Sequence, residues 1–139
     1  MAVRTGFDTG FFVLLAGGDP EATALWDEAA SGKREVLVSA LSLFELHRLG
    51  LRGSVPLEFA EAALEHVPLV CRVVWIDQIE PIRAAGQLSH GLDLTLPDAL
   101  ILATLVAHDC REIFTTDRDL ASYLRQGLEL RLLGGAEPS

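Results

Sequence analysis

Short apolar runs alternate along the chain with stretches in which apolar residues recur every three to four positions. Continuous runs such as 35–39 predict buried strands, and the longer periodic stretches predict helices. Pro20 and Gly32 bracket one of these helices, at the start and end positions that they favour. We expect strands over residues 3–7, 35–39, 69–76, 112–115 and 128–133, and helices over residues 11–15, 20–32, 41–51, 56–66, 78–90, 96–108 and 119–125.

Strands that alternate with helices predict an α/β fold, with a parallel sheet covered on both faces. In such folds the sites form beyond the carboxyl ends of the strands. No repeat or linker divides the 139 residues. We therefore expect one domain over residues 1–133 and a flexible tail over residues 134–139.

Composition narrows the choice of function. Half of the residues are hydrophobic, which excludes a disordered chain. Eleven basic residues against twenty acidic ones give a net charge of −9, which argues against a generic basic nucleic-acid binder. An excess of acidic residues either keeps a protein soluble or includes carboxylates that surround a cation. Two cysteines make no disulfide framework and no apolar run is long enough to span a membrane, so we expect a cytoplasmic protein with free thiols.

Acids stand where the predicted strands end. Asp8, Asp77 and Asp117 follow strands, Asp98 lies in the first turn of the most apolar helix, and Glu45 interrupts an apolar helical face. An acid among so many apolar residues either has a partner or serves a site. Carboxylates that share one edge cannot all ionise without a cation, and Mg²⁺ or Mn²⁺ prefers oxygen ligands. The chemistry that fits is metal-assisted hydrolysis of a phosphodiester.

Each acid also has a purely structural explanation. The Asp-Thr-Gly after the first strand is ordinary turn chemistry. Ser42 and Thr95 stand three residues before two of the acids, which is capping-box spacing. Asp117 or Asp119 could cap the helix that follows. Four unrelated caps at one edge of a sheet explain the pattern less well than one site does.

In four blocks the sequence resembles a PIN-domain ribonuclease of the VapC-toxin type, and the resemblance runs over residues 3–133. The blocks are Phe7-Asp8-Thr9-Gly10, residues 39–46 around Glu45, residues 96–104 around Asp98, and residues 114–120 around Asp117. The resemblance implies a three-layer α/β/α sandwich whose five-stranded, mostly parallel sheet has the order 3-2-1-4-5. It also implies a Mg²⁺ or Mn²⁺ site, cleavage of single-stranded RNA and frequent dimerisation.

By this resemblance the family's four acidic positions, which are catalytic and hold the metal, map onto Asp8, Glu45, Asp98 and Asp117. The strand order brings strands one and four together and leaves Asp77 aside at a sheet edge. The last block departs from the family, because it ends in Asp119-Leu120 where the family often has Asp-Phe. Secondary candidates at the metal are Asp119, Thr9 and Thr116, and Asp93 has no clear role.

Candidate contacts to RNA phosphates are Arg48, Arg52 and Arg118. The first two follow Glu45 by three and seven residues on the same helical face, although each of the three also fits a solvated surface arginine. A dimer through the helices at 41–51 and 56–67 would join the arginines of two copies. By resemblance the partner is an antitoxin, and we expect its apolar residues to pack against the helices near Leu43, Leu46 and Leu49.

Other classes fit less well. A phosphoryl-receiving signalling domain needs a lysine near its acids, and the only lysine, Lys33, precedes the second strand. A nucleotide-binding module needs a glycine-rich loop after the first strand, which is absent. Two alternatives stay open: a PIN nuclease of RNA processing outside a toxin–antitoxin pair, and a catalytically silent PIN-like interaction domain.

Overall fold

The computed structural model describes residues 3–92, 94–123 and 125–134, so Asp93 and the tail beyond Gly134 lie outside the described residues. Five parallel strands form one sheet in the order β3-β2-β1-β4-β5, as predicted. The strands are β1 (Arg4–Phe7), β2 (Glu35–Ser39), β3 (Arg72–Val74), β4 (Glu112–Thr115) and β5 (Glu129–Leu132).

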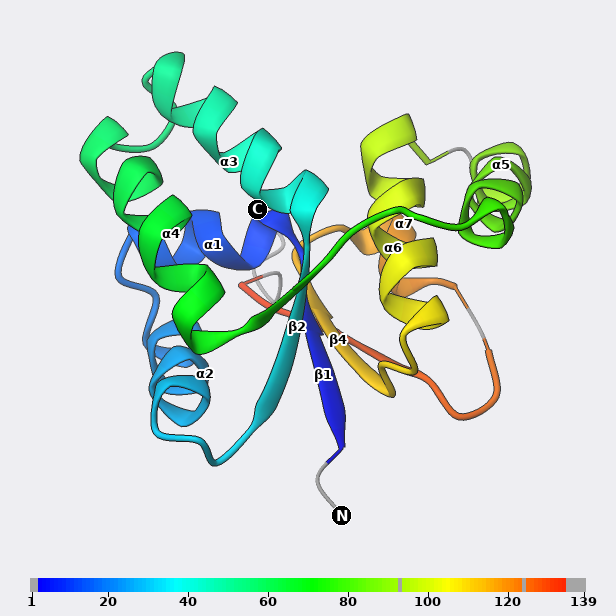
Figure 1. The fold of residues 1–139 in the computed structure, drawn as a ribbon, viewed down its shortest axis with the longest axis horizontal. Coiled ribbons are helices and arrows are strands. Elements are labelled where there is room, and N and C mark those ends of the chain that lie inside the picture. The colour runs from blue at the N-terminus through cyan, green and yellow to red at the C-terminus, as the bar shows by residue number, and fades with distance from the viewer. Residues whose placement is uncertain (1–2, 93, 124, 135–139) are drawn as a thin grey trace.

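Helices cover both faces of this sheet. Four of them, α1 (Thr9–Ala16), α2 (Pro20–Ala30), α3 (Ala40–Leu51) and α4 (Leu57–Val70), lie on one side in Figure 1. On the other side lie α5 (Ile79–Leu92), α6 (Leu96–Ala107) and the short α7 (Arg118–Ala121). The three-layer α/β/α sandwich is thus confirmed. None of the described helices is long and apolar enough to cross a membrane.

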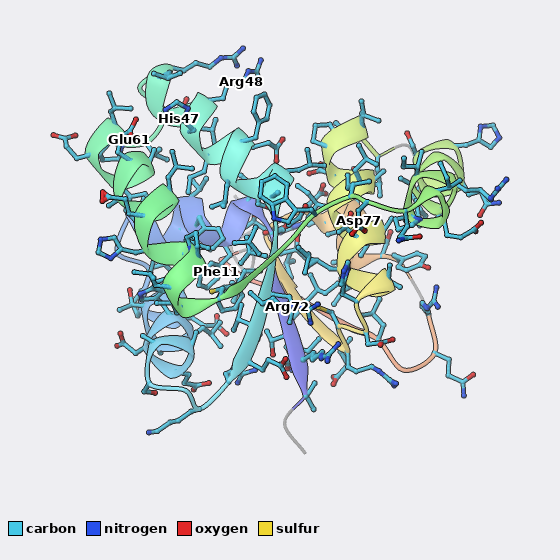
Figure 2. All side chains as sticks on the ribbon, in the orientation of Figure 1. Phe11, His47, Arg48, Glu61, Arg72 and Asp77 are labelled. Carbon is cyan, nitrogen blue, oxygen red and sulfur yellow. The ribbon has the colours of Figure 1, made fainter. Side chains whose placement is uncertain are left out.

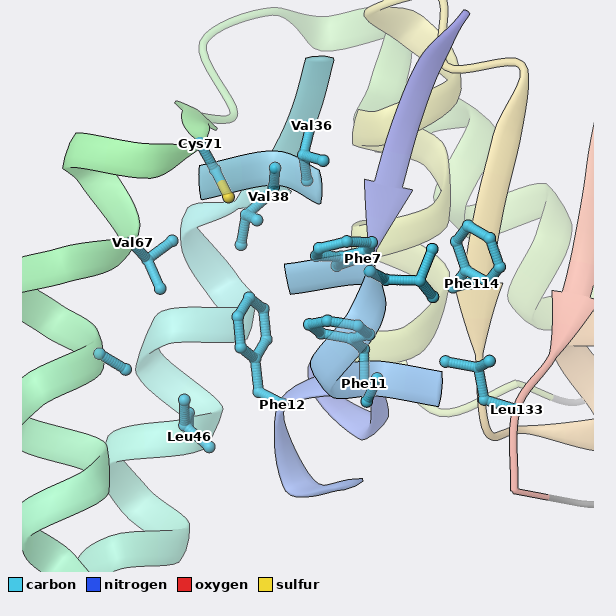
Figure 3. Close-up of a cluster of buried hydrophobic side chains, with 14 of the residues drawn as sticks. Phe7, Phe11, Phe12, Val36, Val38, Leu46, Val67, Cys71, Phe114 and Leu133 are labelled. Atoms are coloured by element: carbon cyan, nitrogen blue, oxygen red, sulfur yellow. The ribbon is translucent and has the colours of Figure 1, made fainter. Parts of the chain in front are cut away.

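The two faces of the sheet bury separate apolar clusters, because side chains alternate along each strand. Val36 and Val38 of β2 face the α1–α4 side, whereas Leu37 faces the α5–α6 side. Around the end of β1, Phe7 and Phe11 stack with ring centroids 3.7 Å apart, and Phe12 lies edge-on to both (Figure 3). This packing fixes the first turn of α1 against the end of β1, where the first candidate acid follows.

Several element bounds differ from those predicted. Helix α4 continues two residues beyond Pro68, past its expected end at His66. A proline removes one backbone hydrogen bond from a helix, but Pro68 is exposed and Val67 beside it is buried in the core. Strand β3 is correspondingly shorter, and α1 begins at Thr9 instead of residue 11.

Candidate metal centre

The sheet brings Asp8 and Asp117 to the same edge. Strands β1 and β4 are neighbours, with Phe7 opposite Phe114, so the residues after both strands lie side by side. The amide of Asp8 donates a 3.3 Å hydrogen bond to the carbonyl of Phe114, which carries the β1–β4 ladder one residue further. Helix α3 starts directly after β2, the other neighbour of β1, and brings Glu45 toward this edge.

Asp8 is buried, with 8% of its surface exposed. Its carboxylate caps α1 by accepting a 3.0 Å hydrogen bond from the amide of Phe11. Burial raises the pKa of Asp8 from its ordinary value of 3.8 to about 6, and hydrogen bonds from Thr115 and Phe11 limit that rise. The charges of Asp98 and Asp117 raise it further. The charged carboxylate is therefore unfavourable here unless a cation balances it.

Asp98 faces the same region from the first turn of α6. The hydroxyl of Thr95, which caps this helix, donates a 3.0 Å hydrogen bond to its Oδ2. Burial raises the pKa of Asp98, and the charges of Asp117 and Glu45 raise it further, while the Thr95 hydrogen bond lowers it. The neighbouring carboxylates therefore disfavour the charged form of Asp98.

Asp117 is held at the start of α7. Its Oδ1 accepts hydrogen bonds from the amides of Asp119, at 2.8 Å, and Leu120, at 3.4 Å. Its own amide donates a 2.9 Å bond to Oγ1 of Thr115. Asp117 therefore caps α7, as expected if this acid had only a structural role. Its charge also raises the pKa values of Asp8 and Asp98. One carboxylate can thus cap a helix and also belong to the group of four acids.

Glu45 does not belong to a capping box. Helix α3 starts at Ala40 and is capped by Ser39, so Ser42 lies inside the helix and its buried hydroxyl makes no hydrogen bond within the described part of the chain. Glu45 instead accepts a 2.6 Å hydrogen bond from the hydroxyl of Thr9. This contact ties α3 to the first turn of α1 and points the glutamate toward the other acids.

Gly10 allows the loop after β4 to approach α1. A Cβ atom at Gly10 would lie 1.9 Å from Oγ1 of Thr116, far inside contact distance. Thr116 therefore sits directly over Gly10, next to Asp117. The glycine of the Asp-Thr-Gly block is needed for this close approach, and its presence brings the two acidic segments together.

Comparisons with known proteins identify the family of the chain. The family model of the PIN domain matches residues 7–125. The chain belongs to the PIN-domain family. A search of the curated proteins finds no match.

Solved structures of VapBC and VapC proteins share the fold of this PIN domain. VapBC2 from Rickettsia felis, bound to a DNA fragment from its promoter, is 16% identical with a TM-score of 0.70, covering 94% of this chain and 98% of its own. VapC20 from Mycobacterium tuberculosis, a toxin that cleaves the sarcin-ricin loop, is 24% identical with a TM-score of 0.65, covering 85% and 93%. A toxin–antitoxin complex from Klebsiella pneumoniae is 22% identical with a TM-score of 0.66, covering 89% and 94%.

The donor set of this PIN domain suits a hard divalent cation. Four carboxylates from four segments act on one another, and two of them have raised pKa values because like charges and burial disfavour ionisation. A group of mutually repelling carboxylates suits Mg²⁺ or Mn²⁺, because these ions prefer oxygen ligands and keep several waters. Within the described residues, no three His, Cys, Asp or Glu side chains stand close enough to hold an ion as they are. A cation would have to draw the carboxylates together.

Some residues expected from the sequence lie farther out. Asp119 is exposed, and only its amide contacts Asp117. Asp77 (labelled in Figure 2) is exposed on the segment after β3, which is an edge strand as predicted. Arg48 points outward from the far part of α3 (Figure 2), and Arg52 is exposed where that helix ends. Arg118 is exposed and interacts with another group of the protein.

Sequence reasoning missed Thr115. This threonine is fully buried, accepts a hydrogen bond from the amide of Asp117 and lowers the pKa of Asp8. A signal for it was present, because a threonine two residues before an aspartate often bonds to the backbone amide of that residue. We named its neighbour Thr116 because that hydroxyl adjoins the acid in sequence.

Proposed function

We propose that this PIN domain is a divalent-metal-dependent endoribonuclease that hydrolyses phosphodiester bonds of single-stranded RNA, and that it is the toxin of a toxin–antitoxin pair. The observation that carries the proposal is the mutual interaction of Asp8, Glu45, Asp98 and Asp117 at the carboxyl edge of the sheet. The VapC and toxin–antitoxin structures that share its fold support the toxin role. An RNA substrate would place its activity in the cytoplasm.

Asp8, Asp98 and Asp117 would hold Mg²⁺ or Mn²⁺, and Glu45 would join them directly or through a water. When bound, such an ion activates a water and neutralises the charge of the phosphodiester. The protein's own groups orient the ligands. Thr95 and Thr9 donate to Asp98 and Glu45, and the first turns of α1 and α7 fix Asp8 and Asp117.

For the RNA path we propose phosphate contacts by Arg48, Arg52 and Arg118, with Asp119, Thr9 and Thr116 as secondary groups near the ion. Arg48 of α3 and Arg52, the residue that caps the end of this helix, are both exposed and follow Glu45 in the chain. One copy with a net charge of −9 offers only a small basic surface. We therefore propose a homodimer that joins the arginines of two copies. Large apolar side chains exposed on α3 and α4, such as Phe44 and Leu69, support pairing through these helices.

The proposed partner is an antitoxin with an arginine that pairs with the carboxylates. Leu46 itself offers no surface to the antitoxin's apolar residues. Leu46 is 1% exposed, and Leu43 and Leu49 pack against the same core cluster. These leucines face the core cluster, where α3 packs against α4 and α1. An apolar hollow of about 410 Å³ between α1, α2 and α4, lined by residues that include Trp26 and Phe59, is the surface we propose instead.

Expression in cells tests the toxin role. The protein should arrest growth when produced alone, and co-production of the protein encoded by its genomic neighbour should relieve the arrest. Asp98→Ala should abolish the arrest at equal protein levels. Arrest that persists with Asp98→Ala would contradict the site, and RNase activity without any arrest would favour a nuclease of RNA processing.

A further inference from the structure

Two glutamates face each other where β4 and β5 begin. Glu112 and Glu129 are the first residues of these strands and are direct partners in the parallel ladder. Like charges at opposite positions of neighbouring strands destabilise a sheet. The side chain of Glu112 is only 12% exposed, so the surrounding water weakens its charge less than that of a surface carboxylate. By themselves these two glutamates would push β5 away from β4.

Arg131 bridges the two glutamates. Its Nε pairs with Oε2 of Glu112, and its Nη2 lies 3.3 Å from Oε2 of Glu129. One guanidinium thus converts a repulsive pair into an attractive group, because its planar fork can serve two carboxylates. From the other side Arg34 holds Glu112, with its Nη1 2.5 Å from Oε1 of that residue. The Glu112 carboxylate is therefore fixed in place and depends on Arg131 to tolerate Glu129.

Little apolar burial holds β5 on the sheet. Within the described residues its only neighbour is β4, and three of its four residues are exposed. The amides of Glu129 and Leu133 tie its two ends to the carbonyls of Arg111 and Thr115, at 2.9 and 2.8 Å, and Leu133 packs into the core. Strands with few buried contacts belong to the part of a fold that opens most easily.

We propose that Arg131 is an electrostatic latch that keeps β5 on the sheet, and that β5 is the strand that opens first when this latch is released. Its release frees the outer edge of β4, which ends two residues before Asp117. Ion pairs weaken as salt rises, because the Debye length falls from about 10 Å at 0.1 M to about 3 Å at 1 M. The latch therefore makes the attachment of β5 sensitive to ionic strength.

Hydrogen exchange of the Glu129 and Leu133 amides, followed by NMR in the whole protein, tests the latch. In the parent, both amides should exchange faster, relative to those of β1 and β2, when NaCl rises from about 0.1 M to about 1 M. Arg131→Gln should speed their exchange about 10-fold or more at the lower salt, because it removes hydrogen bonds to charged groups. In this variant added salt should slow the exchange, since it screens the repulsion between the glutamates.

A second substitution separates charge repulsion from lost packing. Glu129→Gln in the Arg131→Gln background removes one of the two facing charges, and the exchange of Leu133 should return to within about 3-fold of the parent. Arg83→Gln is the control. Arg83 forms an exposed ion pair with Glu80 in α5, and its loss should leave the exchange of the β5 amides unchanged.

Unchanged exchange in Arg131→Gln, or no effect of salt on β5 in the parent, would show that these ion pairs do not hold the strand. An equal rise in the exchange of β1 and β2 would assign the effect to a loss of overall stability. No recovery in the double variant would assign it to lost packing of Arg131. Each of these results would overturn the latch and leave the proposed function standing, because the test involves neither RNA nor a cation at the four acids.

Discussion

The hydroxyl of Thr9 lies 2.6 Å from Oε1 of Glu45, although the two residues are 36 positions apart in the chain. This hydrogen bond joins the first turn of α1 to α3 at the edge where the acids gather. It gives a partner to a glutamate that interrupts an otherwise apolar helical stretch. The position of Glu45 therefore depends on a residue that adjoins Asp8.

Replacing Thr9 by Val should weaken both the fold and the site. A hydrogen bond to a carboxylate contributes about 1 to 3 kcal/mol, so we expect a loss of that order in the free energy of unfolding, measured with urea. RNA cleavage should fall by roughly 10-fold if Glu45 serves the metal. Thr9→Ser keeps the hydroxyl and should behave like the parent. Full activity in Thr9→Val would show that this contact does not matter for the site.

Asp8→Asn should stabilise the protein in buffer with EDTA above pH 6. Folding raises the pKa of Asp8 from 3.8 to about 6, so ionisation opposes folding as pH rises through this window, and the full cost is present above pH 6. The difference corresponds to up to about 3 kcal/mol. Asparagine remains a good helix cap. Below about pH 4 the advantage of the variant should vanish, because both states of the parent are then protonated.

Urea unfolding at two pH values measures this effect. If Asp8→Asn is less stable than the parent at pH 8, burial and the neighbouring charges do not disfavour the ionised Asp8 carboxylate. Asp77→Asn, which alters an exposed acid outside the group, is the control and should leave the stability nearly unchanged at both pH values.

Mn²⁺ should stabilise the protein at pH 8 and lose this effect at low pH. An ion present at 100 times its Kd adds roughly 2.7 kcal/mol when it binds only the folded state. Protonated carboxyl groups bind it poorly. Thermal unfolding should therefore shift upward by several degrees with Mn²⁺, and EDTA should reverse the shift. Asp117→Asn should remove most of the shift, since it keeps the cap of α7 but loses a charge. An unaltered shift in that variant would exclude Asp117 as a ligand.

Gly10→Ala should damage the site by steric contact. The added Cβ would lie 1.9 Å from Oγ1 of Thr116, so the loop before Asp117 must move. We expect a loss of about 1 to 3 kcal/mol in stability together with reduced RNA cleavage. Gly86→Ala is the control, because a Cβ there meets nothing within 4 Å and alanine favours the helix. Combining Gly10→Ala with Thr116→Ala should recover part of the loss, and purely additive effects would contradict the contact.

Patterns along the chain predict the strands and the segments that carry the acids, and the order of the sheet is what the resemblance to PIN-domain ribonucleases implies. The strand ends follow from apolar runs such as that of β2, and the neighbouring positions of Asp8 and Asp117 follow from the strand order. Helix ends are predicted less well. Proline usually ends a helix, yet α4 continues past Pro68 because packing of Val67 outweighs one lost hydrogen bond.

Side-chain directions were harder to predict than element positions. Ser42 has capping-box spacing to Glu45, but the helix begins at Ala40 with Ser39 as its cap. The choice between Thr115 and Thr116 depended on which hydroxyl faces inward. β4 is covered on both faces and ends at the buried Thr115, whereas Thr116 lies beyond the strand and is exposed. The inward direction of Leu46 depended on how α3 packs against α4 and α1, which local spacing does not specify.

Cleavage of single-stranded RNA by the purified protein tests the central claim most directly. The parent should cut RNA with Mg²⁺ or Mn²⁺ and stop when EDTA is added. Asp98→Asn should lose roughly 100-fold or more of that activity, because metal ions supply several kcal/mol of transition-state stabilisation, while Asp77→Asn keeps it. Cleavage by Asp98→Asn at the parent's rate, or undiminished cleavage in EDTA, would contradict the assignment of these four acids as a metal-dependent nuclease site.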